Sequence, residues 1–175
     1  MTIQVGDRLP QTNFRVMGPE GPAAKTTDDV FKGRRVVLVA VPGAFTPTCD
    51  RNHLPGYVAR AAEIKAAGVD AIVFTSVNDV FVQNAWAKSS GAAESIEFIA
   101  DGNADFARAL GLSMDGTGYG LGTRSQRYAM VVEDGVVRSL VVEDTPSKAD
   151  VSNADSMLRT LAALVTANKA VRAET

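Results

Sequence analysis

Two uninterrupted apolar segments place the strongest constraint on how this chain can fold. The first, RRVVLVAVP, covers residues 34–42, and the second, VDAIVFTSV, covers residues 69–77. Because neither alternates apolar with polar residues, each predicts a strand buried on both faces, as in a parallel or mixed sheet. The stretch between them, residues 46–68, has apolar side chains at helical spacing. Together the three segments predict a right-handed β-α-β unit.

Turn residues, helix caps and apolar periodicity predict the elements that follow. These are a helix at 78–91 with Asn78 or Asp79 as its N-cap, a strand at 96–101, a helix at 103–111, a β-hairpin at 127–143 and an amphipathic helix at 153–169. Asn103 is the expected N-cap of the short helix, and Gly111 lies just past its end. The pair Asp134-Gly135 is typical of a type I′ hairpin turn. Before the first buried strand, residues 18–33 are rich in turn formers and then briefly helical.

The predicted order of elements, β-α-β-α-β-α-β-β-α, indicates a thioredoxin-like α/β fold in which helices flank a mixed central sheet. We expect a single domain over residues 1–175, because 46% of the residues are hydrophobic and no low-complexity linker divides the chain. A flavodoxin-like chain begins in the same way, so the pattern by itself leaves that alternative open.

Composition excludes several classes of protein. The net charge is −2 with both signs mixed along the chain, which provides no basic surface for nucleic acid. No apolar run approaches the roughly 18 residues of a membrane span, and MTIQVGDRLP at the N-terminus does not have the pattern of a signal peptide. A single cysteine forms no internal disulfide, so we expect a reducing compartment, most simply the cytoplasm.

The motifs predict neither a cofactor nor a metal. The glycine-rich stretch GTGYGLG, residues 116–122, departs from the G-x-G-x-x-G pattern and does not connect a strand to a helix. We expect it to form a loop that shapes a pocket or an interface. One cysteine and one histidine supply too few soft ligands for a metal site.

The single cysteine lies at a predicted helix start. In the sequence TPTC, Thr46 suits the N-cap, Pro47 suits the first helical position, and Cys49 follows within the first turn. Free backbone N–H groups and the helix dipole favour a negative charge there, and the thiolate is the reactive form of cysteine. His53 follows one helical turn later, where it could act as a base for the thiol. A lone cysteine is also often a small buried apolar residue, so the residues alone leave both interpretations open.

The sequence around this cysteine resembles a known family. PGAFTPTC, residues 42–49, has the P-x-x-x-T-x-x-C pattern of the peroxiredoxin active site, and VPGAFTPTCDRNHLPGY resembles the type II, peroxiredoxin-five-like subfamily. The similarity continues in VGDRLP, in VDAIVFTSVNDVFVQNAW and in GLGTRSQRYAMVVEDG, and extends over roughly residues 3–165.

The resemblance implies a role for each matching residue. Cys49 is similar to the peroxidatic cysteine, which attacks a peroxide oxygen and becomes a sulfenic acid. Thr46 matches the threonine that orients peroxide and thiolate, and Pro42 matches the proline that shields the pocket from water. Arg127 matches the arginine that holds the thiolate and polarises the O–O bond. The implied substrates are hydrogen peroxide and organic hydroperoxides, and the implied assembly is a homodimer through loops near Thr46 and Gly120.

The chain departs from many relatives because it has no second, resolving cysteine. Phe74 and the pair Val151-Ser152 stand at the usual places of that residue. We therefore expect a one-cysteine mechanism in which an external thiol, namely glutathione, glutaredoxin or thioredoxin, recycles the enzyme. A peroxide sensor or redox relay that uses the same cysteine is the alternative function.

Three further residues near the motif carry expectations of their own. Asp50 should help the helix to begin but oppose the thiolate beside it. By the resemblance, Arg124 supports the pocket and His53 is structural or interfacial rather than a catalytic base.

Overall fold

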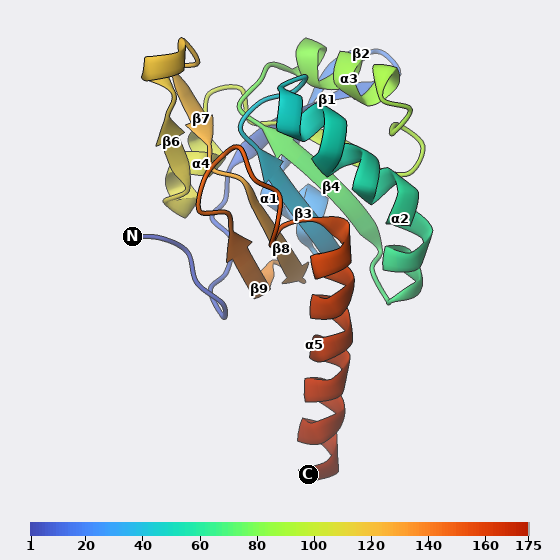
Figure 1. Cartoon of the computed structure of the whole chain (residues 1–175). Helices are drawn as coiled ribbons and strands as arrows, with labels where there is room; N and C mark the ends of the chain where they lie inside the picture. Colours follow the sequence, from blue (N-terminus) through green and yellow to red (C-terminus); the bar gives the residue numbers. More distant parts are fainter. Residues whose placement is uncertain (175) are drawn as a thin grey trace.

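The computed structural model describes residues 1–174, apart from the side chains of residues 170–172 and 174 (Figure 1). Its strands are β1 (Asn13–Gly18), β2 (Gly21–Thr26), β3 (Arg35–Val41), β4 (Ala71–Ser76), β5 (Glu97–Ala100), β6 (Ser113–Asp115), β7 (Thr123–Ser125), β8 (Tyr128–Glu133) and β9 (Val136–Val142). Its helices are α1 (Thr27–Phe31), α2 (Leu54–Ala66), α3 (Val80–Ser89), α4 (Asp105–Leu110) and α5 (Ala154–Glu174). A π-helical segment, η1 (Cys49–His53), precedes α2, and a short 3₁₀ turn, η2 (Thr117–Tyr119), lies between β6 and β7.

The central sheet is mixed, with the strand order β2-β1-β5-β4-β3-β8-β9. Strands β3, β4 and β5 run parallel, whereas β8 pairs antiparallel with β3 and with β9. The predicted β-α-β unit and the predicted mixed sheet are therefore confirmed. The antiparallel β8–β9 hairpin decides against the flavodoxin-like alternative, whose sheet is parallel.

The two buried strands predicted from the sequence form the middle of the core. Along β3, Val37 and Val39 face a core with α2, Trp86 and the first turns of α5, while Val36 and Leu38 face a second core with α1 and α4. None of these four side chains has any exposed surface. Burial on both faces explains why the run does not alternate, because a polar residue on either side would lie in a core.

Several local predictions hold in the structure. Gly111 ends α4 in the left-handed conformation, with φ of 72°. Asp134 and Gly135 both have positive φ, as a type I′ turn requires. Asp79 rather than Asn78 caps α3, since its carboxylate accepts a hydrogen bond from the Val82 N–H at 2.9 Å.

The β1–β2 hairpin and the β6–β7 pair were not predicted. Strand β2 is largely exposed at the edge of the sheet, and β6 and β7 have three residues each. None of these three strands therefore has a clear apolar pattern in the sequence. Only α1 agrees with the brief helix expected within residues 18–33.

The N-cap predicted for α4 was also wrong. Ala104 occupies the cap in a left-handed conformation, and the carboxylate of Asp101 accepts from the N–H groups of Phe106 and Ala107. The capping carboxylate thus belongs to Asp101, which precedes the predicted cap residue Asn103 in the sequence.

The helix that carries the cysteine begins where the sequence indicates. The Thr46 carbonyl accepts the first helical hydrogen bond, from the Asp50 N–H at 2.9 Å. Before α2 the chain forms the π-helical segment η1, where the Leu54 N–H reaches back to the Cys49 carbonyl. Proline has no N–H and its ring clashes with the preceding turn of a regular α-helix, and this wider turn lies directly before Pro55.

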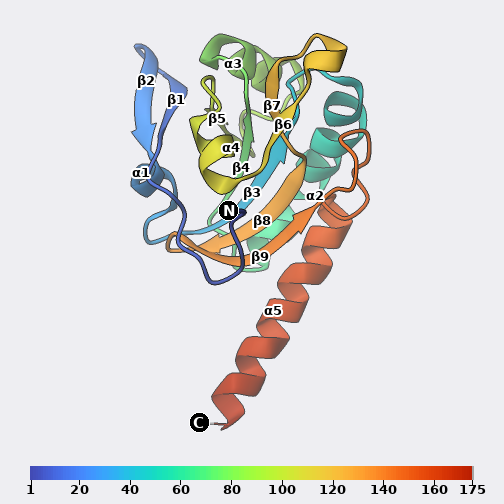
Figure 2. The same cartoon turned by 90° about the vertical axis from the view of Figure 1, so that its left-hand side faces the viewer.

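Helix α5 packs on the sheet only with its first turns, through Ala154, Met157 and Leu161, and its C-terminal half extends beyond the rest of the molecule (Figures 1 and 2). Over residues 1–174, no helix has both the length and the apolar composition needed to cross a bilayer.

Candidate active site

The loop between β3 and the cysteine helix is compact and largely buried. Pro42 and Gly43 are buried directly after β3, and the Thr46 N–H and hydroxyl both return to the Gly43 carbonyl, at 3.3 and 2.7 Å. A Cβ on residue 43 would lie 3.0 Å from the Thr46 Cγ2 atom and 3.2 Å from an Arg124 nitrogen. Glycine at position 43 therefore lets the loop close tightly against Thr46 and Arg124.

Two polar groups converge on the sulfur of Cys49, which has no exposed surface. The Thr46 hydroxyl lies 2.9 Å from Sγ, and the Arg127 Nη2 atom lies 2.8 Å from it. The structure thus brings together Thr46, Cys49 and Arg127, and places Pro42 in the loop that begins the site. The catalytic roles of these four residues stay predictions, because the geometry shows proximity and not reaction.

Arg127 is the most constrained residue of the site, with only 2% of its surface exposed. Its Nε and Nη2 atoms donate to the Pro146 carbonyl at 3.2 and 3.0 Å, and Nη1 lies 2.7 Å from the Nδ1 atom of His53. Among the described residues, its recorded partners include no carboxylate. A buried guanidinium without a carboxylate favours another anion beside it, and the thiolate of Cys49 can supply that charge.

His53 holds the guanidinium through its Nη1 atom. The ring is buried, and burial, together with the charge of Arg127, lowers the pKa of His53 from 6.5 to about 4, against a raising effect of the Ser152 hydrogen bond. We therefore assign the neutral tautomer in which Nδ1 accepts from Arg127 and Nε2–H donates to the Ser152 carbonyl at 3.0 Å. Both ring nitrogens are occupied, which leaves His53 no lone pair for a base role toward Cys49.

A loop that we call the strap, residues 143–152, forms the wall behind Arg127. Its carbonyls at Pro146, Ser147 and Ser152 accept from Arg127, from the Thr48 hydroxyl at 3.0 Å and from the Tyr57 hydroxyl at 2.6 Å, respectively.

The buried carboxylate of Glu143 closes the strap. Its oxygens accept from the N–H groups of Asp150 and Val151 at 2.7–3.1 Å. Sequence reasoning missed the strap because its contribution is made by backbone carbonyls, which any residue type supplies.

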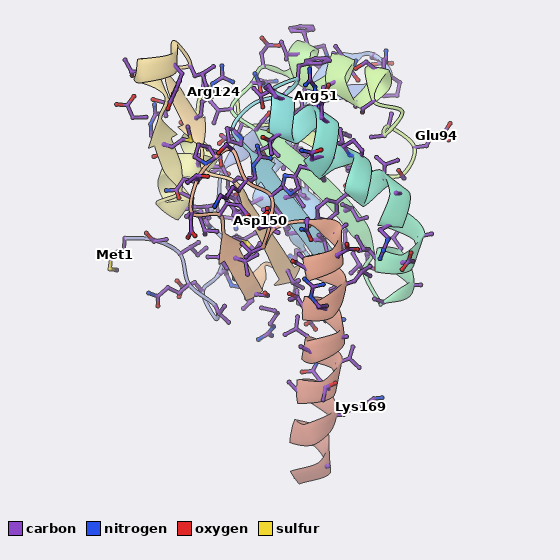
Figure 3. All side chains as sticks on the ribbon, in the orientation of Figure 1. Met1, Arg51, Glu94, Arg124, Asp150 and Lys169 are labelled. Atoms are coloured by element: carbon purple, nitrogen blue, oxygen red, sulfur yellow. The ribbon has the colours of Figure 1, made fainter. Side chains whose placement is uncertain are left out.

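The remaining predicted residues flank the site. Asp50 accepts a hydrogen bond from the Trp86 indole at 2.9 Å, so its carboxylate is engaged with α3. Arg124 donates to the carbonyls of Leu121 and Val77 and thereby ties the loop at 116–122 to the end of β4 (Figure 3). These contacts agree with a supporting role for Arg124.

Other residues occupy the usual places of a resolving cysteine. Phe74 stacks edge to face against His53, Tyr57 and Trp86. Ser152, the last residue of the strap, has no exposed surface, whereas Val151 is 45% exposed. Within the described part of the chain, no group of three or more histidine, cysteine, aspartate or glutamate residues is arranged to hold a metal ion.

Comparison with known proteins identifies the family. Residues 4–158 match the model of the Redoxin family. The chain is 45% identical to the chloroplastic peroxiredoxin-2E-2 of Oryza sativa subsp. japonica, with 91% of this chain and 73% of that protein covered. The chain belongs to the redoxin family. Within it, the chain is a type II, peroxiredoxin-five-like peroxiredoxin, which confirms the resemblance inferred from the motif.

Two further relatives support the assignment of this peroxiredoxin. The hybrid peroxiredoxin hyPrx5 of Haemophilus influenzae is 41% identical, with 93% of this chain and 68% of that protein covered. The crystal structure of reduced Prx3 from Vibrio vulnificus in complex with hydrogen peroxide superposes with a TM-score of 0.87 at 48% identity, covering 91% of this chain and 99% of that chain. The predicted thioredoxin-like fold is confirmed by this match.

The lowered pKa of His53 predicts a loss of stability in mild acid. The unfolded chain binds a proton at this histidine near pH 6.5, whereas the folded peroxiredoxin does so only near pH 4. The full stabilisation is therefore present above about pH 6.5 and is lost as the pH falls toward 4, by about 3 kcal/mol. Urea unfolding at several pH values should show this loss, and His53→Gln should show a smaller one. Identical pH profiles for the two proteins would contradict the assignment.

Proposed function

We propose that this peroxiredoxin reduces hydrogen peroxide and organic hydroperoxides by a one-cysteine mechanism and is recycled by an external thiol. The observation that carries the proposal is the convergence of the Thr46 hydroxyl and the Arg127 guanidinium on the buried sulfur of Cys49. Thiol-dependent peroxidase activity is a property of the family, and our proposal concerns which external thiol reduces the oxidised Cys49.

The geometry suits attack of a thiolate on a peroxide. The Cys49 sulfur forms a bond to one peroxide oxygen, the O–O bond breaks, and the other oxygen leaves as hydroxide or alkoxide, which takes up a proton. Cys49 is thereby oxidised to a sulfenic acid and the peroxide is reduced to water or an alcohol. The Arg127 fork can donate to the sulfur and to the leaving oxygen, where negative charge develops. The Thr46 hydroxyl orients the reactants in line.

An external thiol must complete the cycle, because the chain has one cysteine. The incoming thiolate attacks the sulfenic sulfur, releases water and leaves a mixed disulfide, and a second thiol then restores Cys49. We propose glutathione, glutaredoxin or thioredoxin as this reductant. The sulfur is fully buried, so the helix start must open, and the π-helical segment before Pro55 favours opening at that point.

We also propose that the protein is a homodimer and that it acts in the cytoplasm, a reducing compartment. Three exposed aromatic side chains support a dimer: Phe45 is 47% exposed, Phe81 63% and Tyr119 84%. They lie in the loop before α2, in the first turn of α3 and in η2, which share one end of the molecule in both views (Figures 1 and 2). Aromatic residues grouped on a surface are typical of an interface.

A peroxide sensor or redox relay is the second candidate, since it would use the same sulfenic acid. The two functions differ in turnover: a peroxidase consumes peroxide continuously with a small thiol reductant, whereas a relay requires its protein partner. A steady-state assay with glutathione, glutaredoxin and thioredoxin, each supplied separately, distinguishes them.

Substituting Arg127 should slow peroxide reduction without loss of the fold. Lysine keeps the charge but loses the planar fork, so Arg127→Lys should lower the rate constant for Cys49 oxidation by about 100-fold. Arg138→Lys, at an arginine half-exposed on β9 and paired with Glu133, is the matched control. A full rate in Arg127→Lys would show that the fork is not required.

Treatment with peroxide in the absence of a reductant should oxidise Cys49 to a sulfenic acid, which retains one peroxide oxygen. Intact mass spectrometry after one equivalent of hydrogen peroxide should show the mass of one added oxygen, and excess peroxide should add a second as sulfinic acid. Glutathione added after the first equivalent should produce a mixed disulfide, and Cys49→Ser should show none of these products. A dominant covalent dimer, or no oxygen adduct, would overturn the one-cysteine mechanism.

The exposed aromatic surface should be the dimer contact. Light scattering at micromolar concentration should give the mass of two chains, and Phe81→Glu should shift the protein to one chain by placing a charge in an apolar contact. Val5→Glu, at an exposed residue in the N-terminal segment, should leave the dimer intact. A wild-type monomer would refute the proposed assembly.

A further inference from the structure

The loop that presents Thr46 contains a strained residue. Phe45 has a φ of 65°, in the left-handed region that side chains other than glycine rarely occupy. Such a conformation is unfavourable for a residue with a Cβ atom, so it persists only when surrounding contacts hold it. Part of the support comes from within the loop, where Thr46 returns to the Gly43 carbonyl.

The other support is a side chain from the neighbouring strand. The Oδ1 atom of Asn78 accepts a hydrogen bond from the Ala44 N–H at 2.9 Å. Val41 and Ser76 are paired at the ends of the parallel strands β3 and β4, so the segments that follow them leave the sheet side by side. Asn78 therefore reaches the loop directly before its strained residue.

The side-chain amide of Asn78 is itself held by the buried hydroxyl of Ser76. The hydroxyl of Ser76, which has no exposed surface, lies 2.8 Å from the Asn78 Oδ1 atom and 2.5 Å from the Oε1 atom of Gln83 on α3. Gln83 is 1% exposed. The Ser76 hydroxyl has one proton, and its donation to the Asn78 Oδ1 atom connects the end of β4 to the backbone of the active-site loop. Buried hydrogen bonds of this kind specify one geometry.

The adjacent residues Asn78 and Asp79 have different hydrogen-bond partners, one in the active-site loop and the other in α3. Asp79 caps α3 by accepting from the Val82 N–H, which leaves the Asn78 amide for the loop. Because Ala44 and Phe45 directly precede Thr46, holding the Ala44 N–H sets where the Thr46 hydroxyl meets the Cys49 sulfur, at 2.9 Å.

We propose that Asn78 is a positioning residue for the peroxide reaction: through the Ala44 backbone it holds the Thr46 hydroxyl in its place beside Cys49, and the Ser76 hydroxyl holds Asn78. The inference rests on the proposed peroxidase function and assigns a further residue to the same site. Asn78 lies outside the P-x-x-x-T-x-x-C motif and contacts neither the sulfur nor Arg127 in the described hydrogen bonds.

Two reactions of the same sulfur test the proposal. Oxidation by hydrogen peroxide depends on the Thr46 hydroxyl, whereas alkylation by iodoacetamide requires only the thiolate. Asn78→Ala should lower the rate constant for oxidation by about 10- to 100-fold while changing that for alkylation less than about threefold. Asn78→Asp keeps an acceptor oxygen for the Ala44 N–H and should recover most of the oxidation rate. Asn84→Ala, at an asparagine on α3 that lines the groove beside β1, should match the wild type.

Ser76→Ala is a milder variant that keeps the test decisive if Asn78→Ala does not fold. It leaves the Asn78 contact but removes the hydroxyl that orients it, so oxidation should slow about threefold to tenfold with alkylation unchanged.

Three outcomes would overturn the inference while leaving the proposed function standing. The first is a wild-type rate constant for oxidation in folded Asn78→Ala or, if that variant does not fold, in Ser76→Ala. The second is an equal fall in the rate constants for oxidation and alkylation. The third is a rate constant for oxidation in Asn78→Asp that is as low as in Asn78→Ala. A wild-type protein whose Cys49 does not react with peroxide would instead overturn the proposed function, and this inference with it.

Discussion

The contact between the buried guanidinium of Arg127 and the sulfur of Cys49 is the interaction on which the active site depends. A cation with 2% exposure needs partners on every side, and the protein supplies them from two parts of the chain. The π-helical segment η1 provides both the Cys49 sulfur and the His53 ring, and the strap provides the Pro146 carbonyl. The Pro146 carbonyl carries no charge, and burial keeps the His53 ring deprotonated and neutral at neutral pH. The arrangement therefore favours the negative charge on the sulfur, where the reaction uses it.

The sheet explains why these groups meet. Strands β3 and β4 run parallel, so the segments after both emerge at one edge, which brings the Thr46 loop beside Asn78. Strand β8 runs antiparallel to β3, and Arg127 directly precedes it, so the arginine arrives at the same edge. The strap then returns over this edge and is closed by Glu143. The same closure buries the sulfur, and a one-cysteine cycle must therefore combine a preorganised site for peroxide with a helix start that can open to a thiol.

Sequence patterns were sufficient for the parts of the fold that have strong local signals and insufficient for those at the edges. The buried runs at β3 and β4, the Asp134-Gly135 turn and the Gly111 helix end were recognisable, since periodicity and backbone conformation act over a few residues. Strands β2, β6 and β7 lacked such a signal, because short or exposed edge strands have no second buried face to require apolar residues. Strand β1 lies between β2 and β5, but only its Phe14 is buried. The cap of α4 was misplaced because Asp101 acts from outside the first turn.

The sequence by itself determined the β-α-β unit, the helix start at Thr46, the thiol in its first turn and, through the motif, the peroxiredoxin family. All of these follow from side-chain identity at short spacing. Tertiary structure alone decided that His53 supports Arg127 instead of acting as a base, that Asn78 holds the loop while Asp79 caps the helix, and that the strap carbonyls surround the guanidinium. The physical reason is that these contacts join residues far apart in the chain, such as Cys49 and Arg127 across 78 positions. Many of them also use backbone groups, which every residue carries and no sequence pattern marks.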